Sequence, residues 1–470
     1  MGQVGARLVQ TADRVAHRGR ARAQTGELGE DPPHPVRGLA PGAQLRAGLL
    51  EGVALGVEEA GEVVRVGAHL PDSAPGRTSL RGGPDVREDL PVSHHVLPAS
   101  LLPADGRFGS GPSKVRPEQV AALAAAGAGV LGTSHRQAPV RSLVARVRAG
   151  LAELFALPAG YEVALGNGGS TAFWDVATLC LVRERTQHLV LGEFSAKFAA
   201  AAAAAPFLAE PVVVRGEPGT LPRLGEVAEG VDVVAWPHNE TSTGVMAPVL
   251  RPAGPHPADG GPLVVVDATS GAGGLAVDVS QTDAYYFAPQ KSFASDGGLW
   301  IALLSPAALD RVHEVAATGR WVPASLDLGI AVENSRKDQT YNTPAVATLV
   351  MLAEQVEWML RRGGLSWAAA RSAESAGIVY DWAGAREWAQ PFVTEPAARS
   401  NVVATVDLDP SIDATHVQDV LRHNGIVDVF PYRSLGRNQL RIGVFPAVEP
   451  ADVRALTRCV DHVVAGMRKA

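Results

Sequence analysis

The chain has 470 residues, 46% of them hydrophobic and 19% charged, which is enough for a sizeable core and for two or three domains. Its net charge of −7 gives no reason to expect nucleic acid or an anionic membrane as a partner. No uninterrupted apolar run approaches the ~20 residues of a membrane span. Cys180 and Cys459 are too few for a disulfide framework or a metal cluster. We therefore expect two buried thiols, no metal site and a cytoplasmic protein.

Residues 1–95 differ from the rest of the chain. They are rich in Arg, Gly, Pro and Ala, and their periodicity is weak, although Leu49 to Val64 would suit a short element. Arg14, Arg18, Arg20 and Arg22 are typical of a transit peptide, which is one alternative for this segment. We expect a disordered extension outside the core, or sequence translated from upstream of the true start.

From Gly106 onward, short apolar runs alternate with helical stretches, which indicates an α/β domain with a mainly parallel sheet. The runs expected to form buried strands are Tyr161 to Leu165, His188 to Leu191, Val231 to Trp236, Leu263 to Val266 and Ala284 to Phe287. A long helix is expected within Asn342 to Leu360, after Pro344. We place the large domain at residues 105–370.

The pattern changes near Arg371. Strands are expected at Ser400 to Val406 and Gln439 to Val444, with helices near Thr415 to His423 and Pro450 to Met467. This order predicts a smaller α+β domain over residues 371–470.

Lysine is scarce, and arginine supplies most of the positive charge. Lysine occurs at Lys114, Lys197, Lys291, Lys337 and Lys469. A lysine that arginine could not replace is informative, because only an amine forms a Schiff base. Lys291 follows the apolar run from Ala284 to Ala288, so it would stand at the carboxyl end of a buried strand, where open α/β sheets bind ligands. A solvated surface charge is the alternative, and this position favours a functional amine.

Two further polar segments follow predicted strands. Asp267 comes directly after four apolar residues, and it would either pair with a protonated pyridine nitrogen or close a turn. Gly166 to Thr171 follows a strand and opens a helical run, which suits a phosphate better than a nucleotide, since the segment fits neither the P-loop nor G-x-G-x-x-G. A Schiff-base lysine, a pyridine partner and a phosphate turn together predict pyridoxal 5'-phosphate as cofactor.

Several motifs carry a resemblance over more than three quarters of the chain. They are Arg107-Phe-Gly-Ser-Gly-Pro-Ser-Lys114, Gly132-Thr-Ser-His-Arg136, Gly166-Asn-Gly-Gly169, His238-Asn-Glu-Thr241, Asp267-Ala-Thr-Ser270, Ala288-Pro-Gln-Lys291 and Tyr341-Asn-Thr-Pro344. With them, the chain from about Asp105 resembles the phosphoserine aminotransferases, class V enzymes of fold-type I, and especially the actinobacterial ones.

The resemblance implies a role for each matching position. Lys291 would carry the cofactor, Asp267 would face its ring nitrogen, Phe194 would stack on the ring, and Thr241 would lie near its hydroxyl. The phosphate would be lined by Gly169, Ser170 and Gln290, and by Asn342 and Thr343 of the other subunit of a homodimer with shared active sites. The implied substrate-binding residues are His135, Arg136, Arg433 and Arg441. Tyr432 stands where many relatives have His, and the Arg433–Arg441 interval is longer than in some, so the roles of Arg433 and the nearby Arg437 are less defined.

The resemblance also implies the reaction. L-glutamate and 3-phosphohydroxypyruvate, a phosphorylated 2-oxo acid, would give O-phospho-L-serine and 2-oxoglutarate in serine biosynthesis, and a pyridoxine-pathway intermediate is often a second substrate. The alternatives are another class V activity, such as serine–glyoxylate transamination or cysteine desulfuration, and a cofactor-binding regulatory protein. Desulfuration needs a mobile nucleophilic Cys, and the sequence places both cysteines in apolar or helical segments. A regulatory protein would need a DNA-binding element, and residues 1–95 show no helix-turn-helix pattern.

Overall fold

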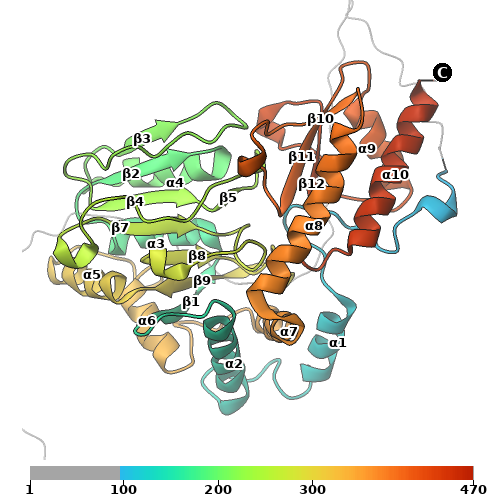
Figure 1. Cartoon of the computed structure of the whole chain (residues 1–470). Helices are drawn as coiled ribbons and strands as arrows, with labels where there is room; N and C mark the ends of the chain where they lie inside the picture. Colours follow the sequence, from blue (N-terminus) through green and yellow to red (C-terminus); the bar gives the residue numbers. More distant parts are fainter. Residues whose placement is uncertain (1–95, 469–470) are drawn as a thin grey trace, which may run out of the picture. The chain divides into compact units, whose positions relative to one another are not determined.

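A computed structural model describes residues 96–468 (Figure 1). The expectations for residues 1–95, including the extension, the transit peptide and the element at Leu49 to Val64, lie outside the described residues. The fold follows from two patterns in the described part, namely short buried strands and amphipathic helices.

A seven-stranded sheet is the centre of the large domain (Figure 1). Its strands, in spatial order, are β1 (Glu162–Gly168), β9 (Gly298–Leu304), β8 (Ala284–Phe287), β7 (Leu263–Asp267), β4 (Val233–Pro237), β2 (Thr186–Val190) and β3 (Val212–Arg215). β9 runs antiparallel to both of its neighbours, and the other pairs are parallel. The expected mainly parallel sheet is confirmed.

Helices cover both faces of this sheet, because alternate strand residues point to opposite sides. In β7, Val264 and Val266 pack into one core, whereas Leu263 and Val265 pack into the other. The first core is completed by α2 (Ala138–Leu154) and α7 (Val346–Arg362), against which α1 (Pro117–Ala126) packs. The second core is completed by α3 (Ser170–Cys180), α4 (Glu193–Ala203), α5 (Pro306–Ala317) and α6 (Leu328–Arg336).

The C-terminal part has its own antiparallel sheet and its own core. The strands are β10 (Ala389–Pro391), β11 (Val403–Leu408) and β12 (Gln439–Gly443), and the helices are α8 (Gly364–Gly384), α9 (Ala414–His423) and α10 (Pro450–Met467). Leu97 and Phe108, from the start of the described chain, are buried in this core. Because α8 runs across residue 370 and packs against both α7 and α10, the domain boundary there stays a proposal.

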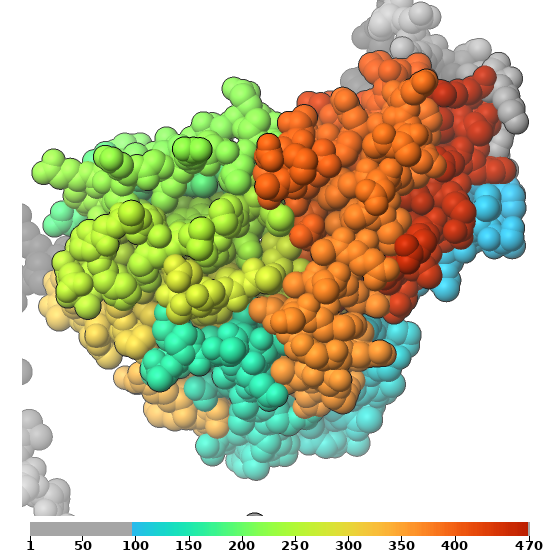
Figure 2. Space-filling model, in the orientation of Figure 1, coloured from blue at the N-terminus to red at the C-terminus, as the bar shows by residue number. Residues whose placement is uncertain are grey.

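The remaining elements are short. They are the ribbon of β5 (Asn239–Glu240) and β6 (Val245–Met246), and the 3-10 turns η1 (Ala99–Leu101), η2 (Pro257–Asp259), η3 (Val279–Gln281), η4 (Pro396–Ala398) and η5 (Arg433–Leu435). Figure 2 shows the small-domain residues, in orange and red, in contact with green and yellow large-domain residues. One such contact is the 2.9 Å hydrogen bond from the Ser400 amide to the Gly244 carbonyl.

Most predicted elements are present, with shifted ends. The strand at Ala284 to Phe287 and the helix at Pro450 to Met467 have the predicted bounds, and α7 begins after Pro344 as predicted. The strand predicted at Tyr161 to Leu165 continues to Gly168, and the one at Ser400 to Val406 begins later, at Val403. β3, β9, β10 and the ribbon of β5 and β6 were not predicted. Across residues 96–468, every helix is too short or too polar to cross a membrane.

Candidate active site

The carboxyl ends of the parallel strands meet at one edge of the sheet, and a cavity of about 390 Å³ opens there. It contains seven of the residues that the sequence nominated. These are Gly169, Ser170, Phe194, Thr241, Asp267, Gln290 and Lys291. β1, β2, β4, β7 and β8 each lead into one or more of these positions, so the sheet itself brings them together.

Lys291 lies in the loop after β8 and is only 8% exposed. Its Nζ donates a 2.6 Å hydrogen bond to the main-chain carbonyl of Ser110. Burial lowers the pKa of the amine to about 7, and the nearby positive charge of Arg441 adds to this effect, whereas Asp267 and Glu240 oppose it. An amine with such a pKa is partly neutral near pH 7, and the neutral form is the one that attacks a carbonyl carbon.

Asp267 ends β7 and is held by two neighbours. Its Oδ1 accepts hydrogen bonds from the Thr269 amide and hydroxyl, and its Oδ2 accepts one of 3.0 Å from the Trp174 indole. The two sequence interpretations of Asp267 are therefore compatible, because the carboxylate closes a turn on Thr269 and also faces the cavity. The structure adds Trp174 and Thr269 to the site. No local sequence pattern marked Trp174 as a partner of Asp267.

The start of α3 forms a place for an anion. Gly169, Ser170 and Thr171 line the cavity, and the N-cap residue Gly169 offers no side chain to the free N–H groups of the first turn. Gln290 also lines the cavity, and its side-chain NH2 group can donate hydrogen bonds to an anion. These free polar groups fit a phosphate at this end of the cavity.

Glu240 is a buried residue that the sequence analysis left unassigned. Its carboxylate accepts hydrogen bonds from the amides of Phe194 (3.3 Å) and Ser195 (3.0 Å) at the start of α4. It also accepts bonds from the hydroxyls of Ser195 and Ser242. A carboxylate at a helix N-terminus is favourable, so Glu240 fixes the helix that carries Phe194.

A second polar chain fixes Thr241. The hydroxyl of Thr241 and the amide of Asn239 both donate to Ser270 Oγ, at 2.8 and 2.9 Å. Since Ser270 follows β7 and Thr241 follows β4, this chain couples the loops of two neighbouring strands on the cavity wall.

Arg441 of β12 is a small-domain residue that contacts the wall of the site. Its Nη1 donates to the Thr241 carbonyl at 3.2 Å, and its guanidinium lies 5.4 Å from the ring centre of Tyr432. Tyr432 in turn meets the ring of Phe194 edge-on at 5.5 Å. Arg433 is exposed in η5.

Four of the nominated residues lie outside this cavity, in an exposed surface cluster. His135 Nδ1 is 3.1 Å from the Thr343 hydroxyl, and Arg136 donates to the Gln339 side chain at 2.7 Å. Asn342 and Thr343 are exposed in the loop before α7. None of these four residues lines the cavity around Lys291 of the same chain.

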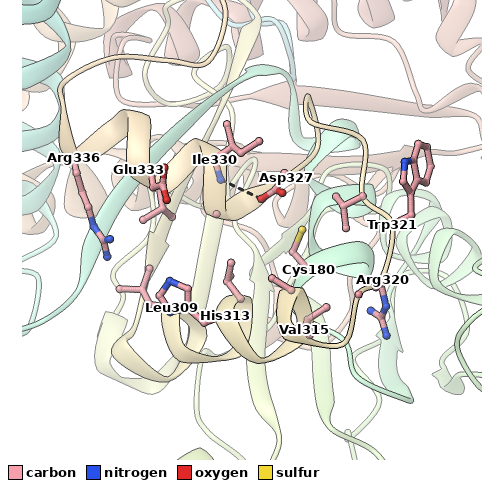
Figure 3. Close-up of a pocket in the computed structure, with 16 residues that line it drawn as sticks. Cys180, Leu309, His313, Val315, Arg320, Trp321, Asp327, Ile330, Glu333 and Arg336 are labelled. Atoms are coloured by element: carbon pink, nitrogen blue, oxygen red, sulfur yellow. Dashed lines mark hydrogen bonds between the residues drawn. The ribbon is translucent and has the colours of Figure 1, made fainter. Parts of the chain in front are cut away.

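A second cavity, of about 590 Å³, lies between α5, α6 and the end of α3 (Figure 3). Cys180 lines it, and burial raises the pKa of this thiol to about 12. Burial also raises the pKa of Cys459 to about 11. Both cysteines are buried, as expected, and neither carries a thiolate near neutral pH, which argues against cysteine desulfuration.

The fold and this set of groups define a pyridoxal-phosphate-dependent enzyme of fold-type I. A buried amine of low pKa, a fixed carboxylate and an anion-binding helix start surround one cavity. Residues 109–428 match the family described as Aminotransferase class-V, and the chain belongs to that family.

Known proteins agree with this assignment. The phosphoserine aminotransferase of Rhodococcus opacus is 60% identical over 375 residues, which are 80% of this chain and 99% of the relative. A relative from Mycolicibacterium vanbaalenii is 63% identical over 368 residues, 78% of this chain and 98% of its own length. Among solved structures, the phosphoserine aminotransferase of Cytophaga hutchinsonii has a TM-score of 0.70 at 21% identity, and covers 76% of this chain and 99% of its own.

Proposed function

We propose that this enzyme transfers the amino group between L-glutamate and 3-phosphohydroxypyruvate, giving O-phospho-L-serine and 2-oxoglutarate in serine biosynthesis. The single observation that carries the aminotransferase chemistry is Lys291, whose buried amine, with its pKa lowered to about 7, faces a cavity that also holds Asp267. The 60% identity to a phosphoserine aminotransferase over nearly the whole relative supports this substrate pair.

The residues present divide the work between them. Lys291 would hold the cofactor, and its amine would take up and return the proton at the substrate Cα. Asp267 would hold the positive charge on the ring nitrogen, and the start of α3 would hold the phosphate. Bound pyridoxal phosphate supplies the electron sink that makes the Cα proton removable.

Arg441 is suited to the substrate α-carboxylate, because its planar guanidinium is half-buried at the cavity edge and its hydrogen bonds in this state go to the Phe430 and Thr241 carbonyls. The second anion of each substrate would be bound by Arg136, Arg433 and His135. Arg136 and His135 reach a site only if it belongs to another subunit, since they lie outside the cavity of their own chain.

A homodimer with shared sites follows from that geometry and forms part of the proposal. The surface cluster of His135, Arg136, Asn342 and Thr343 would complete the cavity of the partner subunit. The exposed side chain of Tyr341 in the same loop suits a surface that a second copy covers. We place the dimer in the cytoplasm.

Mixing one inactive and one impaired variant tests the reaction and the shared site together. K291A lacks the amine, and R136A lacks the proposed partner contribution. In mixed dimers of C2 symmetry, one of the two sites has both residues intact, so about a quarter of wild-type activity should return after subunit exchange. The readout is 2-oxoglutarate formed from glutamate and 3-phosphohydroxypyruvate. A mixture no more active than the sum of its components would refute the shared site, and an inactive wild type would refute the proposed reaction.

A further inference from the structure

We propose that Trp174 is a positioning residue for the cofactor, and that its indole N–H fixes the Asp267 carboxylate for the ring nitrogen. This inference rests on the proposed function and extends it to a residue of α3 that is one turn beyond the anion-binding start. Trp174 itself lines the cavity and is 6% exposed.

The hydrogen bonds of Asp267 leave one acceptor position open. A carboxylate offers about four lone-pair positions on its two oxygens. Thr269 uses those of Oδ1, through its amide at 3.0 Å and its hydroxyl at 2.5 Å. Trp174 uses one position of Oδ2 at 3.0 Å. The buried Tyr286 hydroxyl also approaches this carboxylate, and a lone-pair position facing the cavity would serve a protonated ring nitrogen.

Trp174 is itself fixed, so it can direct the carboxylate. Its ring stacks on that of Phe198, with 16° between the planes and 6.5 Å between the centres. Both rings belong to the same buried core, which packs α3 and α4 against the sheet. A ring held in this way presents its N–H in one direction.

A single helix, α3, then carries groups that would bind both ends of the cofactor. Ser170 stands at the first position of α3, where the phosphate would bind, and Trp174 follows one turn later, where the pyridine ring would end. Because a helix is rigid over one turn, the distance between the phosphate-binding and ring-binding groups is fixed by α3 and not by loop conformation.

Burial makes the Trp174 hydrogen bond important. Asp267 is 7% exposed, and the neighbouring hydroxyls of Tyr285 and Tyr286 are fully buried. In such surroundings a lost hydrogen bond is costly, so without the indole donor the carboxylate would be held less firmly toward a cation.

The test compares two ligands that differ only at the ring nitrogen. Pyridoxal phosphate and 1-deaza-pyridoxal phosphate share the aldehyde and the phosphate, but carbon replaces the nitrogen in the second. Equilibrium dialysis against the cofactor-free enzyme gives both dissociation constants. The variant is W174F, which keeps an aromatic ring but removes the N–H donor.

Trp236 provides the matched control. It is 5% exposed, its indole donates to the Pro248 carbonyl at 3.2 Å, and it packs into the core on the other face of the sheet. W236F therefore loses an equivalent hydrogen bond without touching Asp267. The thermal unfolding of both cofactor-free variants separates general loss of stability from loss of positioning.

We expect W174F to raise the dissociation constant of pyridoxal phosphate about tenfold more than that of the deaza compound, as for the loss of a hydrogen bond to a charged group. W236F should leave the ratio of the two dissociation constants unchanged. W174H, which keeps a ring N–H, should retain part of the wild-type preference for pyridoxal phosphate. If W174F does not fold, W174H alone decides whether a donor at this position carries the preference. Equal weakening of both ligands, or none, would overturn the inference. A wild type that binds neither compound would instead overturn the proposed function.

Discussion

The Lys291 amine donates its hydrogen bond to the Ser110 carbonyl, and Gly111 follows at once with its Cα facing the same amine. Gly111 has φ +140°, and a Cβ there would overlap the end of the lysine side chain. The loop before α1 therefore fixes the position of the reactive nitrogen by close approach of the backbone, which glycine alone permits.

G111A tests this packing. We expect it to cost about 1–3 kcal/mol in the free energy of unfolding, because the backbone conformation is strained for alanine. Displacement of the amine should also lower the amount of cofactor bound per subunit, measured by absorbance. G129A is the control, since a Cβ at Gly129 would meet nothing within 4 Å. Full cofactor content in G111A would show that the lysine moves aside without loss.

K291A should reduce transamination to background while leaving a folded dimer, because it removes the amine placed at the cavity. D267N should retain some cofactor and lose most activity, since an amide cannot hold the pyridinium charge. Steady-state rates and size-exclusion chromatography measure both effects. K337A, at an exposed lysine after α6, is the control. Near-normal turnover by K291A would move the active site elsewhere.

The pKa of Lys291, lowered to about 7, predicts two pH effects in the cofactor-free enzyme. Attachment of pyridoxal phosphate should speed up as pH rises through about 7 and then level off, as the amine becomes neutral. Between about pH 7 and 10.5, the unfolded chain binds more protons at this group than the folded chain does. This group therefore makes the free energy of unfolding rise with pH in that window, by at most about 1.4 kcal/mol per unit.

Stopped-flow absorbance measures the rate of attachment, and urea unfolding at several pH values measures the stability. K291A provides the baseline for the other titrating groups, so the difference between the two proteins is the quantity to compare. A difference that stays constant from pH 7 to 10 would contradict the lowered pKa.

The three proposed substrate-binding arginines should differ in which substrate anion they bind. R441A should lower kcat/KM for phosphoserine and for alanine alike, because it would lose the contact with the α-carboxylate that both donors share. R136A and R433A should lower kcat/KM for phosphoserine by roughly tenfold to a hundredfold and barely change the slow reaction with alanine. R437A is the control, since Arg437 is ion-paired with Asp407 at 2.5 Å. Small, uniform effects from all three would mean that the anions bind elsewhere.

Removal of residues 1–91 should leave folding, dimerisation and turnover unchanged, because every nominated site residue lies beyond residue 105. A chain starting at Asp105 should be less stable, since it also loses Leu97, which is 2% exposed in the small-domain core, and η1. Thermal unfolding and specific activity of the two truncated chains test this. Loss of activity in the longer one would make the N-terminal residues part of the working enzyme.

The sequence predicted the sheet edge and its chemistry well, for a physical reason. Runs such as Leu263 to Val266 are apolar throughout because parallel strands are buried on both faces, so Asp267 and Lys291 were marked by where the apolar runs stop. β9 was missed because its six buried residues follow a glycine-rich loop that already seemed to end the pattern.

Contacts between distant segments could not be predicted in that way. The bonds from Trp174 to Asp267 and from Lys291 to Ser110 join residues 93 and 181 positions apart, and neither has a local signature. The surface cluster around His135 raises a different problem, because its expected role depends on a second chain. A single sequence gives residue types for such contacts, but not their partners.

Arg441 connects substrate arrival to the basicity of Lys291. In the cofactor-free enzyme its positive charge contributes to the low proton affinity of the amine, although Arg441 lies in the small-domain sheet and Lys291 in a loop of the large domain. A substrate carboxylate bound by Arg441 would neutralise that charge. The proton affinity of the Lys291 amine would then rise at the step in which the amine must remove a Cα proton. Titration of the amine by NMR, with and without a non-reactive dicarboxylate, would reveal an upward shift that R441A abolishes.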